Sequence, residues 1–101
     1  MKLSFEATLT VMKICYAASF ETKDYERRQL TEGIFFLADY LENLVTEQKI
    51  PTLTHALASI GELRDMANDL FKDSSKWVGT ERFNNDCYRL LTDNPGKFQE
   101  E

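Results

Sequence analysis

The sequence of 101 residues contains few of the residue types from which most catalytic and metal sites are built. It has one histidine, His55, and two cysteines, Cys15 and Cys87, which lie far apart and form no Cys-x-x-Cys pair. A histidine-based metal cluster therefore cannot form, and neither a zinc site nor a redox motif is indicated. The four glycines are scattered singly, which excludes a glycine-rich phosphate loop. We expect no catalytic residue, no metal and no cofactor, and hence no enzyme.

Long hydrophobic runs are also missing. No segment approaches the roughly 20 apolar residues of a membrane-spanning helix. The N-terminal segment does not read as a signal peptide, because Ser4, Thr8 and Thr10 interrupt its apolar positions. We therefore expect a cytoplasmic protein without membrane contact. Its two cysteines would be reduced thiols in the core, with one long-range disulfide left open if the protein is exported.

Positive charge is in short supply. The chain has 12 Lys and Arg against 17 Asp and Glu, a formal net charge of -5. Such a balance disfavours nonspecific attraction to nucleic acid or anionic lipid and favours a basic partner. With 43% hydrophobic residues the chain can fold in water, and its length allows one hydrophobic core. A single folded domain is expected.

One stretch, residues 30–45, organises the predicted fold. Leu30, Ile34, Leu37, Leu41 and Leu44 follow one another at steps of four and three, which places them on one face of an α-helix. The same kind of periodicity recurs on both sides of this stretch. The expected helices span about 5–20, about 23–48, from 53 to a break at 73–75, and from 80 to a turn at 94–96.

Capping residues and prolines set the expected helix boundaries. Thr22 is a candidate cap for the second helix, and Thr52 or Thr54 for the third. Pro51 stops the second helix, because proline lacks a backbone N–H and clashes with the preceding turn. The sequence thus predicts an all-α fold, a single-domain antiparallel bundle of about four helices over residues 1–96, followed by a short polar tail at 97–101.

Acidic residues form a ridge on the expected third helix. Glu62, Asp65, Asp69 and Asp73 recur at intervals of three and four residues, on the side facing away from its apolar residues. The simpler interpretation is a solvated face of an acidic protein. The functional interpretation is an acidic surface that attracts a basic partner and so speeds its association with the protein.

Aromatic residues of the second helix lie off its leucine seam. Tyr25 and Phe36 project to nearly the opposite side, with Tyr40 and Gly33 bordering them. We favour burial of this second stripe beneath another helix, with Gly33 allowing a close backbone approach. The alternative is an aromatic surface that binds another protein. The exposure of Phe36 distinguishes the two.

Trp77 lies in the weakly patterned joint between the third and fourth helices. We favour its packing as a plug at the end of the core, because tryptophan is usually largely buried. An exposed Trp77 beside Lys76 and Arg82 would instead be a candidate interface anchor.

In size, acidity, helix content and lack of catalytic motifs, the chain resembles small bacterial immunity proteins that neutralise contact-dependent growth-inhibition toxins or nuclease colicins. This resemblance covers the chain as a whole and transfers no individual residue. It implies a cytoplasmic inhibitor that binds a cognate toxin domain, often a basic nuclease, and occludes its active site or substrate surface. The acidic ridge, Tyr25, Phe36, Tyr40 and Trp77 would then be the candidate partner-binding residues.

Two other functional classes remain open. A phage-type or plasmid-type inhibitor of a host nucleic-acid-binding protein would have the same acidity. A helical interaction protein that forms a homodimer through the aromatic stripe of the second helix is the third possibility. Direct nucleic-acid binding is disfavoured, because acidic residues are interspersed among the basic ones.

Overall fold

The computed structural model describes residues 3–20, 22–48, 53–77 and 79–93. Within these ranges the chain is helical and contains no strand, so the predicted all-α bundle is confirmed. The elements are α1 (Phe5–Ala18), α2 (Asp24–Gln48), α3 (Leu53–Lys72), the short 3-10 helix η1 (Ser74–Lys76) and α4 (Glu81–Asp93). Pro51, Thr52, the turn at 94–96 and the tail at 97–101 lie outside the described residues.

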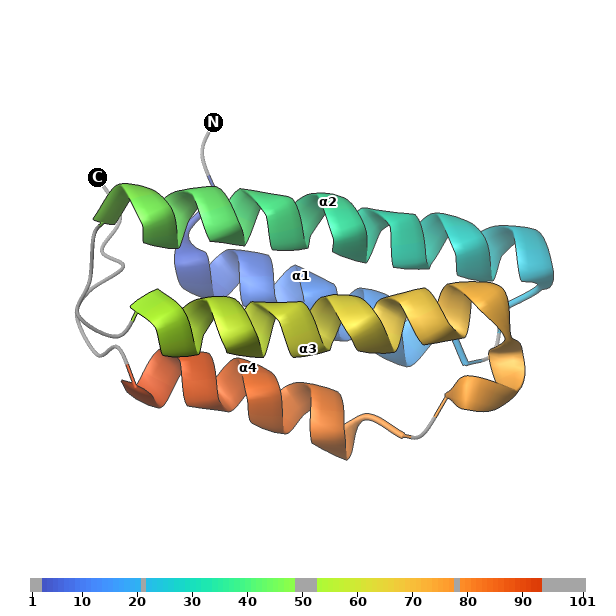
Figure 1. The fold of residues 1–101 in the computed structure, drawn as a ribbon. Helices are drawn as coiled ribbons and strands as arrows, with labels where there is room; N and C mark the ends of the chain where they lie inside the picture. Colours follow the sequence, from blue (N-terminus) through green and yellow to red (C-terminus); the bar gives the residue numbers. More distant parts are fainter. Residues whose placement is uncertain (1–2, 21, 49–52, 78, 94–101) are drawn as a thin grey trace.

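The four α-helices pack as an antiparallel bundle with α2 as its longest member (Figure 1). α2 packs against both α1 and α3, and α4 packs against α3 and α1. This order of neighbours leaves one side of every helix facing outward. The bundle is elongated, with principal extents of 39 × 27 × 16 Å.

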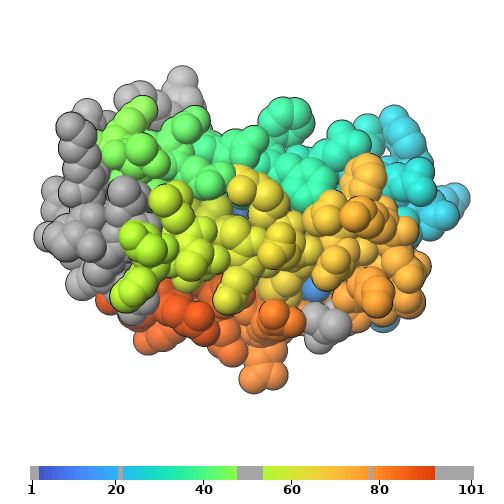
Figure 2. Space-filling view, viewed as in Figure 1, coloured from blue at the N-terminus to red at the C-terminus, as the bar shows by residue number. Residues whose placement is uncertain are grey.

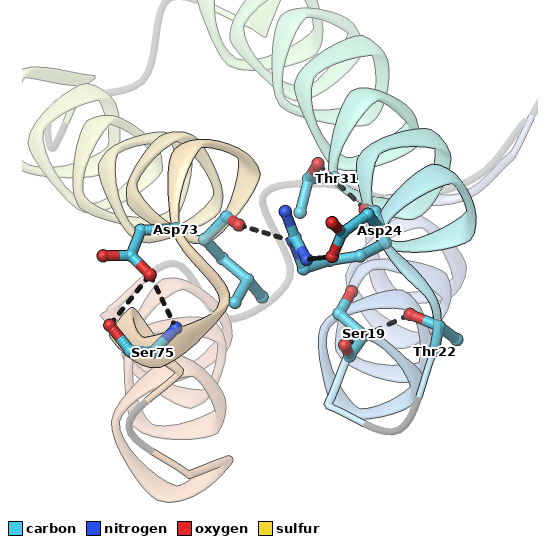
Figure 3. A network of polar contacts seen from close by, with 8 residues as sticks. Ser19, Thr22, Asp24, Thr31, Asp73 and Ser75 are labelled. Atoms are coloured by element: carbon cyan, nitrogen blue, oxygen red, sulfur yellow. Dashed lines mark hydrogen bonds and ion pairs between the residues drawn. The ribbon is translucent and has the colours of Figure 1, made fainter.

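The turn between α1 and α2 differs from the sequence prediction. Ser4 caps α1, its Oγ accepting from the Ala7 backbone N–H at 2.9 Å, and the helix ends two residues earlier than expected. The Thr22 hydroxyl donates to the Ser19 carbonyl at 3.2 Å, as Figure 3 shows. Because α2 begins at Asp24, Thr22 belongs to the turn, and its prediction as the helix cap is wrong. Thr54 is not a cap either, since it lies inside α3.

The core is built from the inward faces of all four α-helices. Part of the predicted leucine seam is confirmed, since Ile34 and Leu41 are fully buried. Leu30, Leu37 and Leu44 are only half-buried. The centre of the buried stripe is rotated because α2 must face α1 on one flank and α3 on the other. The stripe therefore also includes Arg27, Thr31, Ala38 and Val45.

Arg27 is the least expected member of this buried stripe. Its side chain is only 4% exposed, and its Nε donates to the Leu70 carbonyl at 3.0 Å. Leu70 belongs to the last turn of α3, where backbone carbonyls have no helical partner. The guanidinium thus satisfies the C-terminus of α3 and places positive charge at the negative end of its dipole.

A small polar network holds this arginine in place (Figure 3). Arg27 Nη1 forms an ion pair with Asp24 at 2.6 Å, and the Thr31 hydroxyl donates to the Arg27 carbonyl at 3.1 Å. Arg28, the next residue, lies over the Phe71 ring, 5.8 Å from its centroid. Two neighbouring arginines of α2 therefore bind the end of α3 in different ways.

Both cysteines are free thiols, the alternative that the sequence analysis favoured over one long-range disulfide. Cys87 is buried, and desolvation raises the pKa of its thiol to about 12. Cys15 is half-buried, and burial raises its thiol pKa as well. Raised pKa values keep both sulfurs protonated and poorly nucleophilic at neutral pH.

Replacing Arg27 should be costly for stability. Arg27→Ala would leave the Leu70 carbonyl without its donor and remove a packed side chain, so we expect a loss of about 2–3 kcal/mol of unfolding free energy. Arg28→Ala is the matched control and should cost less than about 1 kcal/mol. Chemical denaturation followed by circular dichroism measures both. Equal losses for the two variants would contradict the capping role of Arg27.

Candidate functional site

The outer face of α2 carries two large aromatic side chains exposed to solvent. Tyr25 is 72% exposed and Phe36 is 74% exposed. The favoured expectation that another helix covers this stripe is therefore wrong. α1 and α3 occupy the two flanks of α2, and the exposed side chains of Tyr25 and Phe36 lie outside both contacts. Aromatic side chains are enriched at protein-binding surfaces, which makes these two residues candidates for a contact with another protein.

Gly33 borders Phe36 and leaves open surface beside it. A Cβ atom built on Gly33 would meet nothing within 4 Å apart from its own helix, so the expected close approach of another helix does not occur. Glycine inside a helix costs about 1 kcal/mol relative to alanine. No packing within the described part of the chain accounts for that cost.

The other aromatic residues of the stripe are held by hydrogen bonds. The Tyr40 hydroxyl donates to the Leu3 carbonyl at 2.8 Å, and its side chain is half-buried against the start of α1. The Tyr25 hydroxyl accepts from Gln29 Nε2 at 3.1 Å. Tyr40 thus joins α2 to α1, whereas Phe36 is the more exposed, apolar member of the group.

Carboxylates flank Phe36 at its neighbouring helical positions. Glu32 and Asp39 stand four residues before and three residues after it, and both are exposed. Asp39 pairs with Arg64 of α3 at 2.6 Å, and Arg64 also pairs with Glu42. The interaction with Glu42 raises the pKa of the Arg64 guanidinium further, so it stays charged.

Glu32 and Asp39 were missed as site residues in the sequence analysis. Their spacing from Phe36 is visible in the sequence, but its meaning depends on Phe36 being exposed. Once that exposure is known, the i−4 and i+3 positions identify them.

The acidic residues of α3 lie on a different side of the bundle. Asp65 and Asp69 are exposed, and Glu62 faces Asp86 of α4. Asp73 follows the end of α3 and caps η1, its Oδ1 accepting from the Ser75 backbone N–H and hydroxyl (Figure 3). These hydrogen bonds lower the pKa of the Asp73 carboxyl. The structure therefore separates the acidic ridge from the aromatic stripe, because α3 faces α2 through its opposite flank.

A buried carboxylate lies beneath this ridge. Asp86 is 2% exposed, and its Oδ2 has no hydrogen-bond partner. Arg89 Nη1 approaches its Oδ1 at 3.7 Å, too far for a strong charged hydrogen bond. Desolvation, and then the neighbouring Glu62 carboxylate, raise the pKa of Asp86. Protonation of Asp86 removes both the cost of burying its charge and its repulsion from Glu62.

Trp77 serves the core, as the favoured interpretation predicted. Its Nε1–H donates to the Tyr16 carbonyl at 3.2 Å, and its ring lies 4.3 Å from that of Phe20 and 6.3 Å from that of Tyr16. Tyr16 in turn stacks on Phe83. The half-buried indole closes one end of the core and leaves little of itself for a partner.

Within the described ranges, no three His, Cys, Asp or Glu side chains gather so as to hold a metal ion. No helix among these residues is long and apolar enough to cross a membrane. Comparison with protein-family models, curated proteins and solved structures finds no match for the chain. A function must therefore be inferred from the surfaces described above.

The buried Asp86 predicts an unusual dependence of stability on pH. Because its pKa is raised in the folded state, the folded chain binds more protons than the unfolded chain above the usual value of 3.8. The contribution of Asp86 to the free energy of unfolding therefore falls as the pH rises from 3.8 to the raised pKa of the folded state.

Asp86→Asn should flatten this pH dependence and raise the unfolding free energy at pH 7 by on the order of 1 kcal/mol, because it removes a buried carboxylate charge that the ion pair with Arg89 at 3.7 Å compensates only weakly. Asp69→Asn, at an exposed position, is the control. Denaturation curves between pH 4 and pH 8 measure the effect. A variant less stable than the wild type at pH 7 would contradict this assignment.

Proposed function

We propose that this protein is a binding inhibitor that neutralises a basic protein partner, in the manner of an immunity protein acting on a toxin. The observation that carries the proposal is the exposure of Phe36 on α2, between the carboxylates Glu32 and Asp39. An exposed aromatic side chain bordered by negative charge is suited to a pocket rimmed by Lys or Arg.

The inhibitor works by steric and electrostatic occlusion. Phe36 enters an apolar pocket of the partner, where it is shielded from water and contributes most of the binding energy. The edge of that pocket rests on the open surface beside Gly33. Glu32 then pairs with basic groups around the pocket, and Asp39, which also pairs with Arg64 of α3, adds negative charge beside them. In a nuclease those groups bind substrate phosphates, so the carboxylates occupy the place of the nucleic acid. The proposal assigns no catalytic step to any residue of this chain.

The acidic residues of α3 contribute to the rate of association. Asp65 and Asp69 are exposed and lie outside the proposed contact around Phe36. Together with the net charge of -5 they attract a basic partner over a distance of about a Debye length, roughly 10 Å at 0.1 M salt. They therefore act mainly on the association rate and less on the lifetime of the complex.

The proposed site of action is the cytoplasm, where an immunity protein protects its producer. A phage-type or plasmid-type inhibitor of a host nucleic-acid-binding protein is the second candidate, because a basic substrate surface would be recognised by the same chemistry. The protein encoded next to this one distinguishes them. A secreted protein with a basic, toxic C-terminal domain supports immunity.

The test of the proposal is co-expression with that neighbouring domain. The wild-type protein should restore growth, and isothermal titration should give a one-to-one complex. Phe36→Ala should weaken binding by about 2 kcal/mol, close to 30-fold, as expected for a buried anchor. Tyr88→Ala removes an equally exposed aromatic side chain from α4 and serves as the control.

Two outcomes would overturn the proposal. One is a neighbouring basic domain that is toxic and whose toxicity the wild-type protein leaves unchanged. The other is a complex that Phe36→Ala leaves as tight as before, which would place the contact elsewhere on the protein.

The steering role of α3 can be measured separately. Asp65→Lys combined with Asp69→Lys should slow association with the basic partner about tenfold at low salt, with little change in dissociation, because these charges lie outside the contact. Stopped-flow measurements at several salt concentrations give both rates. An association rate equal to that of the wild type at low salt would show that α3 takes no part in steering.

A further inference from the structure

Asp86 lies where the helical periodicity of α4 favours an apolar residue. It stands three residues after Phe83 and four before Leu90, on the same face of the helix, and all three side chains are buried. Its Oδ2 has no hydrogen-bond partner, and no other buried side-chain oxygen or nitrogen of the described residues is in this state. Buried polar atoms are rarely left unpaired, so this one requires a physical explanation.

The charged groups around Asp86 come from three helices. Glu62 of α3 lies within hydrogen-bonding reach of its carboxyl and repels its charge. Arg82 and Arg89 of α4 attract that charge, but Arg89 Nη1 stays 3.7 Å from Oδ1 and its side chain is 54% exposed. α1 contributes Lys13, whose charge acts on the residue next to Asp86 in α4. None of these three cations therefore neutralises the buried carboxylate at close range.

A proton accounts for the unpaired oxygen. Two ionised carboxylates offer only acceptors, so Glu62 and Asp86 form no hydrogen bond while both are charged. Once one of them binds a proton it donates to the other, and an O–H···O bond to a charged oxygen is short and strong. The same proton also removes the repulsion between the two groups, as in other carboxyl pairs that share a site.

Burial decides which carboxyl of the pair holds the proton. Asp86 is 2% exposed, whereas Glu62 is exposed to water. An ionised carboxyl keeps its hydration at the exposed position and loses it at the buried one. The proton therefore resides on Asp86, whose O–H donates to the Glu62 carboxylate.

We propose that Asp86 and Glu62 share one proton across the contact between α3 and α4, and that loss of this proton to water at rising pH loosens α4 from the bundle. α4 holds to the core through Phe83, Cys87 and Leu90, and Asp86 lies among them. A charge at this place is hydrated only when α4 opens locally, so ionisation favours the opening. The contact acts within one chain and does not depend on the function proposed above.

A carbon NMR titration of the Asp86 carboxyl tests the shared proton. In the wild type its pKa should lie above the ordinary value of 3.8. Glu62→Gln removes the repelling charge and supplies an amide that donates to ionised Asp86, so the pKa of Asp86 should move to lower pH. Asp65→Asn removes an exposed charge from the same helix and should leave this pKa nearly unchanged. A Glu62→Gln pKa equal to that of the wild type, or an equal shift in Asp65→Asn, would overturn the pairing.

Hydrogen exchange resolved by helix tests the loosening of α4. From about pH 4 to about pH 8, the protection factors of α4 amides in the wild type should fall about fivefold relative to those of α2. Asp86→Asn should keep this ratio constant, because its amide N–H donates to the Glu62 carboxylate at every pH and carries no charge. A wild-type ratio that does not change with pH would overturn the proposal, and so would an equal fall in Asp86→Asn.

Discussion

The buried guanidinium of Arg27 is the interaction on which the arrangement of this bundle depends. It connects the start of α2 to the last turn of α3, because its Nε donates to the Leu70 carbonyl. A buried cation is tolerated there because Asp24 and the end of the α3 dipole compensate its charge. The bond contributes to the register between α2 and α3, and the packing of α1 and α3 on the two flanks of α2 leaves its remaining residues facing outward.

That register gives α2 two different sides. Its inner stripe and both flanks are used by the bundle, which leaves Phe36 and Glu32 exposed on the outer face, while Asp39 at the edge of that face pairs with Arg64 of α3. α1 likewise has residues that the bundle does not cover, namely the exposed side chains of Val11 and Ile14 on its outer side. The two surfaces differ in chemistry, one aromatic and acidic, the other aliphatic and neutral. We propose a basic partner for the aromatic and acidic surface for this reason.

Two features of the structure lower the free energy of unfolding. Asp86 is buried with an unpaired oxygen beside Glu62, and Gly33 weakens α2 without any packing in return from the described chain. Arg64 of α3 compensates some of the negative charge of α2 by pairing with Asp39 and Glu42. The acidic character of the chain thus has a structural cost at Asp86.

The sequence alone was sufficient to predict four helices and an all-α bundle, because helical periodicity and prolines are local properties. It also placed Trp77 at the end of the core. Only the tertiary structure decided that Arg27 is buried, that Thr22 belongs to a turn, and that Phe36 is exposed. Each of these depends on which helices stand beside α2 and on their register, and such long-range contacts leave no periodic signal in the sequence. The face of a helix that remains outside is decided by its neighbours.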